Sequence, residues 1–418
     1  NHSRFYLDNY PSFYAASAQD LAEAVNMDYR IYLPDGYFDS NQRYPVVYLL
    51  HQFNSTSKSY EIDGVDELLD KGMASGEIQD MIVVIPDSSA TSFWRGDWEL
   101  MVTEELVPFI NENYRTIADS RFNGTAGASM GGQGAYGVGL RNPNLFSSII
   151  SFFGAFSYGG PASPNKIVTE VSNDYLQYFS HYFISGNRDS FGFGTSHITL
   201  DKQLRQKETA HLFEIENGEH DSAFYIPYFI DAFKYTSDHM FQTGGVIGDH
   251  ASGELEASIE DDLLSVSVKL VLDDSFDQWL NQIPESTYTE EKNPEMIIPL
   301  TYQIIQDGKI VFTELDYPTV AGTTTIDLEK EIKIGTSYLA DHEFAASDVN
   351  LEQDFTLIVF ASILDTNKEL GIVEFIADQT DTPEEGQEKP TEEEVISDDD
   401  EKEVPVDDEV IIPIEDDQ

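Results

Sequence analysis

Short apolar runs alternate with helix-like segments from Met27 to about residue 243. The runs are continuously apolar, which is typical of strands buried on both faces of a parallel sheet. The segments between them show helical spacing or end at a Gly or Pro. The predicted strands cover residues 44–51, 80–87, 121–129, 145–153, 181–187 and 210–218. This order predicts an α/β fold, with a mostly parallel sheet covered by helices on both sides.

The pattern changes beyond residue 252, where strand-like runs are separated by turn residues. Asp307-Gly308 lies between two apolar runs, which is a strong signal for a β-hairpin. We therefore predict a small antiparallel all-β sandwich over residues 252–378, following an α/β domain over residues 1–245.

Composition narrows the classes of partner. The 418 residues carry a net charge of −54, with 77 acidic and 23 basic side chains. Such a balance argues against binding nucleic acid or an anionic membrane surface. No apolar run reaches the roughly 20 residues of a membrane-spanning helix. The chain has no cysteine, and its start at Asn1 suits a mature exported chain. We expect a secreted or cell-surface protein.

Residues 379–418 form an acidic tail. Residues 381–418 alone hold 18 acidic residues and 2 lysines, a composition typical of a solvated, disordered segment. Near its end lies an apolar stretch, Val410 to Ile414. Our hypothesis is that this stretch adds as an edge strand to the β-domain of the same or a neighbouring molecule, which would allow self-assembly.

The sequence GASMG, residues 127–131, places Ser129 between glycines where a predicted strand gives way to a helix. In a nucleophile elbow the serine lies on a sharp strand-to-helix turn that leaves room only for small neighbours. Gly127 and Gly131 meet that demand. The alternative is a small-residue turn that only permits close packing. The strand–turn–helix context favours a nucleophile.

A serine hydroxyl needs a base, and the base needs an orienting group. Asp189 and His220 each follow a predicted strand, in the chain order Ser, Asp, His of an α/β-hydrolase. Alternatives remain for both roles. Asp221 and Asp174 are further candidates for the acid, and His197 and His211 are further histidines in this region.

Four segments together resemble the esterase-D-like α/β-hydrolases, which include feruloyl and acetyl-xylan esterases and S-formylglutathione hydrolases. They read YPVVYLLHQF, FNGTAGASMGGQGAYGVGLRNPNLFSSIISFFGAF, FISGNRD and GEHDSAFY. The resemblance covers about residues 25–243 and implies an esterase. It also implies that Ser129 is the nucleophile, Asp189 the acid and His220 the base.

The oxyanion of a tetrahedral intermediate needs preorganised donors. The N–H of Met130, directly after the nucleophile, is one candidate. The resemblance implies a second at Phe53, after a family glycine that is Gln52 in this chain. Either Gln52 adopts the backbone of that glycine, at a cost of about 1 kcal/mol, or the loop is reshaped and activity suffers.

Residues after the strands are expected to contact the substrate, because ligands bind at the carboxyl ends of such sheets. An aromatic group there suits a phenolic acyl group or a sugar face, although core packing is an alternative reading of the same residues. The candidates for substrate binding are Gln52, Phe53, Trp94, Trp98, Phe152, Phe153, Phe156 and Tyr158.

Together these features predict a serine carboxylesterase for ester-linked acyl groups, such as feruloyl or acetyl groups on polysaccharides. No cofactor or metal is predicted, because no HExxH or phosphate-binding loop occurs. The alternative hypothesis is a surface structural or filament-forming subunit on an esterase-like fold with weak or no activity. Gln52 and the tail motivate that alternative.

Overall fold

The computed structural model describes residues 4–39, 42–158, 160, 163–240 and most of 251–376. Within the last range, the residues outside the description are 261, 273, 285–294, 299, 317–318, 322–324, 335–344, 347–348, 352 and 364–365. The predicted boundary near residue 245 falls in 241–250 and the predicted tail begins at residue 379. Both lie outside the described residues, so the domain limits and the added edge strand remain predictions.

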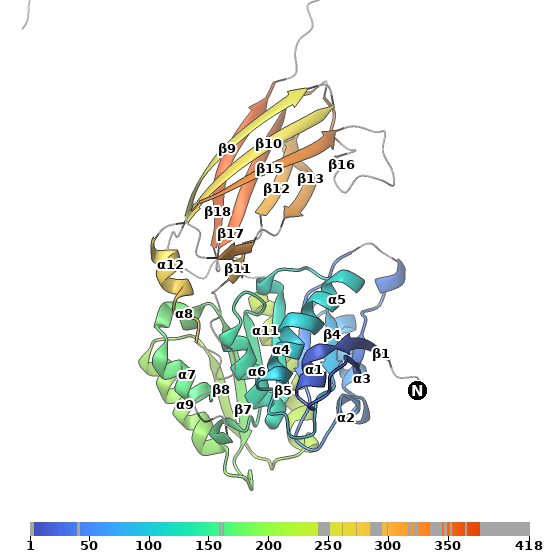
Figure 1. The fold of residues 1–418 in the computed structure, drawn as a ribbon, viewed down its shortest axis with the longest axis vertical. Coiled ribbons are helices and arrows are strands. Elements are labelled where there is room, and N and C mark those ends of the chain that lie inside the picture. The colour runs from blue at the N-terminus through green and yellow to red at the C-terminus, as the bar shows by residue number, and fades with distance from the viewer. Residues whose placement is uncertain are drawn as a thin grey trace, which may run out of the picture. The chain divides into compact units, whose positions relative to one another are not determined.

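An eight-stranded sheet forms the first part of the chain, in the order β1-β2-β4-β3-β5-β6-β7-β8 (Figure 1). The six strands from β4 to β8 in this order are parallel, which confirms the α/β prediction. The strands are β1 (Phe5–Ser12), β2 (Val25–Tyr32), β3 (Val46–Leu50), β4 (Ile82–Pro86), β5 (Asn123–Ala128), β6 (Ser148–Phe152), β7 (Ser180–Gly186) and β8 (Leu212–Glu216). The antiparallel edge strands β1 and β2 were not among the predicted strands.

Both faces of this sheet are covered because alternate residues of a strand point to opposite sides. In β3, Val47 and Leu49 join one core cluster, while Val46, Tyr48 and Leu50 join another. The first cluster includes side chains of α2, α3, α10 and α11, and the second includes those of α1, α4, α5 and α6. This double burial explains why β3 reads as continuously apolar.

The helices of the α/β part vary in length, and a π-helical segment, Met101–Leu106, joins α4 to α5. They are α1 (Phe13–Ser17), α2 (Lys58–Ile62), α3 (Val65–Ser75), α4 (Asp97–Leu100), α5 (Val107–Asn113), α6 (Met130–Arg141), α7 (Pro164–Glu170), α8 (Asn173–Gln177), α9 (Gly194–Gln206), α10 (Ser222–Tyr225) and α11 (Phe229–Met240).

The second part of the chain contains two four-stranded sheets, β16-β15-β10-β9 and β13-β12-β17-β18, and a two-stranded sheet of β11 and β14. Leu264 and Val266 of β10 share one core cluster with Tyr302 of β12 and Leu357 of β17. The two larger sheets therefore pack as a β-sandwich. The strands are β9 (Ala251–Glu260), β10 (Leu263–Leu272), β11 (Glu295–Ile297), β12 (Leu300–Gln306), β13 (Lys309–Asp316), β14 (Thr319–Ala321), β15 (Thr325–Ile334), β16 (Ala345–Ala346), β17 (Phe355–Ile363) and β18 (Thr366–Phe375).

The predicted hairpin at Asp307-Gly308 is confirmed. Gln306 of β12 pairs with Lys309 of β13, which leaves a two-residue connection. Asp307 and Gly308 have φ values of 52° and 71°. Positive φ at both central residues is the backbone of the turn that matches the twist of paired strands.

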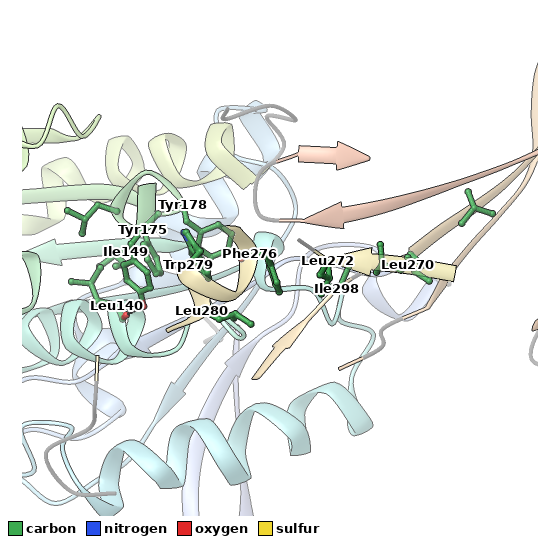
Figure 2. Packing of buried hydrophobic residues seen from close by; sticks show 14 of the residues in the cluster. Leu140, Ile149, Tyr175, Tyr178, Leu270, Leu272, Phe276, Trp279, Leu280 and Ile298 are labelled. Carbon is green, nitrogen blue, oxygen red and sulfur yellow. Dashed lines mark hydrogen bonds between the residues drawn. The ribbon is translucent and has the colours of Figure 1, made fainter. Parts of the chain in front are cut away.

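A short helix that sequence reasoning missed, α12 (Asp274–Leu280), follows β10. Its Trp279 stacks on Tyr175 with ring centroids 5.0 Å apart and meets Tyr178 edge-on at 5.5 Å. The indole Nε1 donates to the backbone oxygen of Asp174 at 3.2 Å. Figure 2 shows these rings together with the apolar side chains around them. The helix thus attaches to α8 of the α/β part through an aromatic anchor.

Candidate active site

Ser129 lies on the sharp turn between β5 and α6. Its backbone has φ 57° and ψ −116°, a region that costs a non-glycine residue free energy. Two backbone hydrogen bonds brace this turn: Ser129 N donates to Phe152 O at 2.9 Å, and Ala155 N donates to Ser129 O at 3.0 Å. The serine therefore has the strained strand-to-helix geometry of a nucleophile elbow.

The glycines on either side of Ser129 are required by space. A Cβ built on Gly131 would lie 1.9 Å from the backbone oxygen of Leu50. A Cβ on Gly127 would lie 2.4 Å from the carbonyl of Gly131. Because the clashing atoms belong to the backbone, no side-chain rotation relieves them. The two glycines let the turn close against the end of β3.

Tyr60 of α2 ties the two strand ends together beneath the elbow. Its buried hydroxyl donates to Leu50 O at 2.8 Å and accepts from Ala128 N at 3.1 Å. Burial raises the pKa of Tyr60 well above the ordinary tyrosine value, so the hydroxyl keeps its proton and can donate. The residue before Ser129 is thereby fixed to the end of β3.

The structure brings Ser129, His220 and Asp189 together at the carboxyl ends of β5, β8 and β7. His220 Nε2 lies 2.8 Å from Ser129 Oγ, and His220 Nδ1 lies 2.8 Å from Asp189 Oδ2. The Asp189 side chain is 1% exposed and the His220 side chain 10%. A carboxylate only accepts, so Nδ1–H donates to Asp189 and Nε2 is left to accept the serine proton.

Neighbouring groups hold the histidine and the acid in place. Asp189 Oδ1 accepts from the backbone N–H of Phe191 at 2.8 Å. The ring of His220 lies 4.3 Å from Phe153, 4.7 Å from Phe191 and 5.3 Å from Phe193, between centroids. These rings limit the rotation of the imidazole and exclude water from its flanks.

The loop after β3 departs from the backbone expected at the missing family glycine. Gln52 is not among the described residues with positive φ, whereas Asn54 has φ 53°. Asparagine is among the non-glycine residues that best tolerate this conformation. Gln52 thus does not take a left-handed backbone, and Phe53 lies at the cavity beside Ser129. Phe53 N–H has no acceptor among the described residues.

A cavity of about 180 Å³ opens beside the serine hydroxyl. Its walls are almost entirely apolar. The lining residues are Phe53, Phe93, Ser129, Met130, Ala155, Tyr158, Phe191, Phe193 and His220. Phe93 stacks on Tyr158 with centroids 5.9 Å apart, so the two form one aromatic wall.

Sequence reasoning found some of this lining and missed the rest. Phe53 and Tyr158 were predicted to contact substrate, and both line the cavity. The other predicted substrate-binding residues, Gln52, Trp94, Trp98, Phe152, Phe153 and Phe156, are not part of the lining. Trp94, which precedes α4, and Trp98, within α4, lie in one core cluster, and Phe156, after β6, lies in another. The run DSFGF after the strand-end acid was the one signal for the missed Phe191 and Phe193.

The alternative acids and bases have other partners. Asp221 caps α10 by accepting from Phe224 N at 3.1 Å, and Asp174 lies in α8. His197 Nδ1 lies 2.8 Å from the backbone oxygen of Phe193, and His211 Nε2 lies 3.0 Å from Asp201. None of these lines the cavity at Ser129.

Two features of the described part of the chain bear on binding partners. No cluster of three or more His, Asp or Glu side chains there is arranged to hold a metal ion. No helix there has the length and apolar character that crossing a bilayer requires.

The sheet order, the elbow and the serine–histidine–aspartate contacts define a protein of the α/β-hydrolase class with the architecture of a serine esterase. Residues 24–240 match the model of the Esterase family, described as "Putative esterase". This match spans more than half of the 418-residue chain. The chain belongs to that family, as the sequence resemblance predicted.

Three similar proteins illustrate the relationship. The chain is 33% identical over 159 residues to "Endo-1,4-beta-xylanase/feruloyl esterase" of Xylanibacter ruminicola, covering 35% of this chain and 21% of that protein. It is 29% identical over 167 residues to "Esterase Rv1288" of Mycobacterium tuberculosis, covering 37% of this chain and 34% of that protein. The chain thus spans only a minor part of these relatives. A solved ferulic acid esterase has the same fold, with a TM-score of 0.51 and 24% identity over 58% of this chain and 100% of that one.

Proposed function

We propose that this protein is a serine carboxylesterase in which Ser129 is the nucleophile, His220 the general base and Asp189 the orienting acid. The observation that carries the proposal is the pair of 2.8 Å contacts that link the three side chains. Family membership supports ester hydrolysis as the reaction. Phe53 lines the cavity beside Ser129 although Gln52 stands where the family has glycine, so the alternative of an inactive structural subunit is not favoured.

In the proposed reaction, Ser129 Oγ attacks the ester carbonyl while His220 Nε2 takes its proton. Asp189 keeps the proton on Nδ1 and stabilises the imidazolium that forms. Collapse of the tetrahedral intermediate expels the alcohol, which receives the proton from His220. Water then attacks the acyl-enzyme by the same route in reverse and releases the acid.

Two backbone N–H groups are proposed to bind the oxyanion. Met130 is the first residue of α6, so its N–H has no acceptor within the helix. It also lies at the positive end of the helix dipole, which favours negative charge. The N–H of Phe53 is proposed as the second donor. Removal of one such donor typically costs about 10²- to 10³-fold in kcat.

The lining of the cavity supports an aromatic acyl group as the preferred one. Phe53, Phe93, Tyr158 and Phe193 offer ring faces and edges on which a planar ring can pack. We therefore propose feruloyl-type esters ahead of acetyl esters, and polysaccharides as carriers of the acyl group. The printed name of the Xylanibacter relative, which includes a feruloyl esterase, is consistent with this choice. A higher kcat/KM for p-nitrophenyl acetate than for p-nitrophenyl ferulate, two esters with the same leaving group, would overturn it.

The proposed setting is outside the cell or at its surface, as the net charge of −54 suggests. There, the β-sandwich is proposed either to bind polysaccharide or to mediate self-assembly with the tail. Pull-down on insoluble xylan tests the first role, and sedimentation of the full chain over a range of concentrations tests the second. A chain that neither binds the polymer nor assembles contradicts both roles.

The serine assignment is tested by Ser129→Ala. We expect hydrolysis of p-nitrophenyl acetate to fall by roughly 10⁴-fold or more, with an unchanged circular dichroism spectrum and melting temperature. Ser75→Ala, a change at an exposed serine at the end of α3, is the matched control for background esterolysis. Turnover that survives in the folded Ser129→Ala variant contradicts the assignment.

A further inference from the structure

The loop after β3 is built by hydrogen bonds from the segment that follows β4. Ser57 N donates to Asp87 Oδ1, and Asn54 N donates to Ala90 O at 2.8 Å. These contacts hold the part of the loop from Asn54, which has positive φ, to Ser57. They join residues 30 and 36 positions apart in the chain, so no local sequence motif encodes them.

His51 holds the start of the same loop, directly after β3. Its ring is fully buried. Its backbone oxygen accepts from Trp94 Nε1 at 3.2 Å. Its Nε2 lies 3.1 Å from Ser88 N and 3.0 Å from Ser88 Oγ. Its Nδ1 lies 2.8 Å from Gln52 O.

The protonation of His51 follows from these partners. The backbone N–H of Ser88 can only donate, so Nε2 must be the unprotonated nitrogen that accepts. Nδ1 then carries the proton and donates it to Gln52 O. Burial lowers the pKa of His51 below its ordinary value, which keeps the ring neutral and this tautomer intact.

The carbonyl of Gln52 and the N–H of Phe53 belong to one peptide unit. That unit is planar and trans, so its C=O and N–H point in opposite directions. A hydrogen bond that draws Gln52 O toward buried His51 therefore turns the Phe53 N–H away from the core. Phe53 lies beside Ser129 at the cavity, where that N–H is left without a protein acceptor.

We propose that His51 is a positioning residue, which sets the direction of the Phe53 N–H through its hydrogen bond to Gln52 O. The inference rests on the proposed function, because it assigns a role to one donor of the same oxyanion hole. The inference adds to the oxyanion hole a side chain, that of His51, which does not itself contact the substrate.

The test uses three substitutions that separate the two ring nitrogens. His51→Asn keeps an N–H donor on the γ carbon, at the place of Nδ1. His51→Gln moves the amide one bond further, toward Ser88, and removes the donor to Gln52. His51→Ala removes both. For each variant, kcat and KM are measured with p-nitrophenyl acetate. The concentration of active sites is determined by titration with a fluorophosphonate, so that kcat refers to active enzyme. The inhibition constant of phenylboronic acid is measured as well. That compound forms a tetrahedral adduct on a serine and presents an oxygen to the oxyanion donors.

We expect His51→Ala and His51→Gln to lose about 10²-fold in kcat, the effect of one oxyanion donor, with KM within about threefold of wild type. Their affinity for phenylboronic acid should fall in parallel. His51→Asn should keep kcat within about tenfold of wild type. If His51 were purely structural, kcat would fall equally in all three variants, in parallel with a fall in melting temperature.

Three results overturn the inference. In the first, folded His51→Gln keeps wild-type kcat. In the second, His51→Asn is as impaired as His51→Gln. In the third, the boronate binds all variants equally. If His51→Ala does not fold, the Asn and Gln pair still decides. A folded wild-type protein with no turnover and no labelling refutes the proposed function itself, and this inference with it.

Discussion

The elbow at Ser129 and the loop from His51 to Ser57 lie against each other, yet they are held by different forces. The elbow is fixed by close packing, since a Cβ on Gly131 would lie 1.9 Å from Leu50 O. The loop is fixed by hydrogen bonds from the segment after β4, such as the 2.8 Å bond from Asn54 N to Ala90 O. A substitution that disrupts close packing is expected to lower the stability of the fold. A substitution that removes an orienting hydrogen bond is expected to lower the catalytic rate while the fold remains intact.

The largest effect is expected where one hydrogen bond, from His220 Nδ1 to Asp189, sets the tautomer of the base. Asp189→Asn presents an N–H to His220 Nδ1 and so favours the wrong tautomer, with Nε2 protonated. We expect kcat to fall by about 10⁴-fold. The melting temperature should change little, because the amide keeps the shape and can still accept from Phe191 N. Steady-state kinetics and thermal melts of one preparation check this. A melting temperature that collapses together with kcat contradicts the distinction between the two regions.

The packed elbow should respond in the opposite way. Gly131→Ala forces backbone atoms of α6 and β3 apart, so we expect a loss of about 3 kcal/mol or more in the free energy of unfolding. Gly194→Ala at the start of α9 is the control, since its Cβ would lie 3.7 Å from its nearest neighbour, Ser185 Oγ, an ordinary van der Waals contact. Urea unfolding measures both. A Gly131→Ala variant as stable as the control shows that close packing does not hold the elbow.

Three buried or half-buried histidines should make the stability of the fold depend on pH. Burial lowers the pKa of His181 to about 3 and those of His197 and His239 to about 4. The unfolded state titrates near 6.5, so it binds more protons than the folded state between pH 6.5 and 4. The free energy of unfolding therefore falls as the pH drops through this window, by about 1.4 kcal/mol per pH unit for each histidine.

His181→Gln isolates one of these histidines. Gln keeps an N–H donor for Leu176 O, which lies 2.9 Å from His181 Nε2. We expect the stability of this variant to fall less steeply below pH 6.5, by about 1.4 kcal/mol per pH unit. Urea unfolding at pH 6.5, 5.5 and 4.5 gives both slopes. Equal slopes show that His181 takes up its proton without unfolding.

The smallest effect is expected at Gln52. Because Gln52 does not adopt positive φ, a glycine there relieves no strain and adds freedom to the unfolded chain. Gln52→Gly should cost at most about 1 kcal/mol in stability and change kcat by less than about threefold. A large gain in kcat is the result that shows the loop to be strained at this residue.

The contrast also explains what the sequence could predict. Ser129 was recognisable because its constraint is local: the glycines that make room for the turn are its own neighbours. Asp189 and His220 were recognisable because each follows a strand predicted from the sequence, and parallel strands bring their carboxyl ends to one edge. Short-range patterns thus encode the elbow and the order of the triad.

Contacts between distant segments have no such signature. The aromatic wall of Phe93 and Tyr158 joins two loops, and the loop at Gln52 depends on Ser88 and Ala90 after another strand. Edge strand β1 was missed because it exposes Leu7 to solvent and lacks a continuous apolar run. These features become visible only when the fold brings the segments together.

The central claim is that His220 activates Ser129, and the most direct measurement is the site of covalent labelling. The full chain is treated with a fluorophosphonate at neutral pH, digested and mapped by mass spectrometry, beside the His220→Asn variant and heat-denatured protein. We predict one phosphonylated residue, Ser129, in the folded wild type, and labelling at least about 10²-fold slower in both controls. A folded wild-type chain that stays unlabelled, or that carries the label on another serine, contradicts the account.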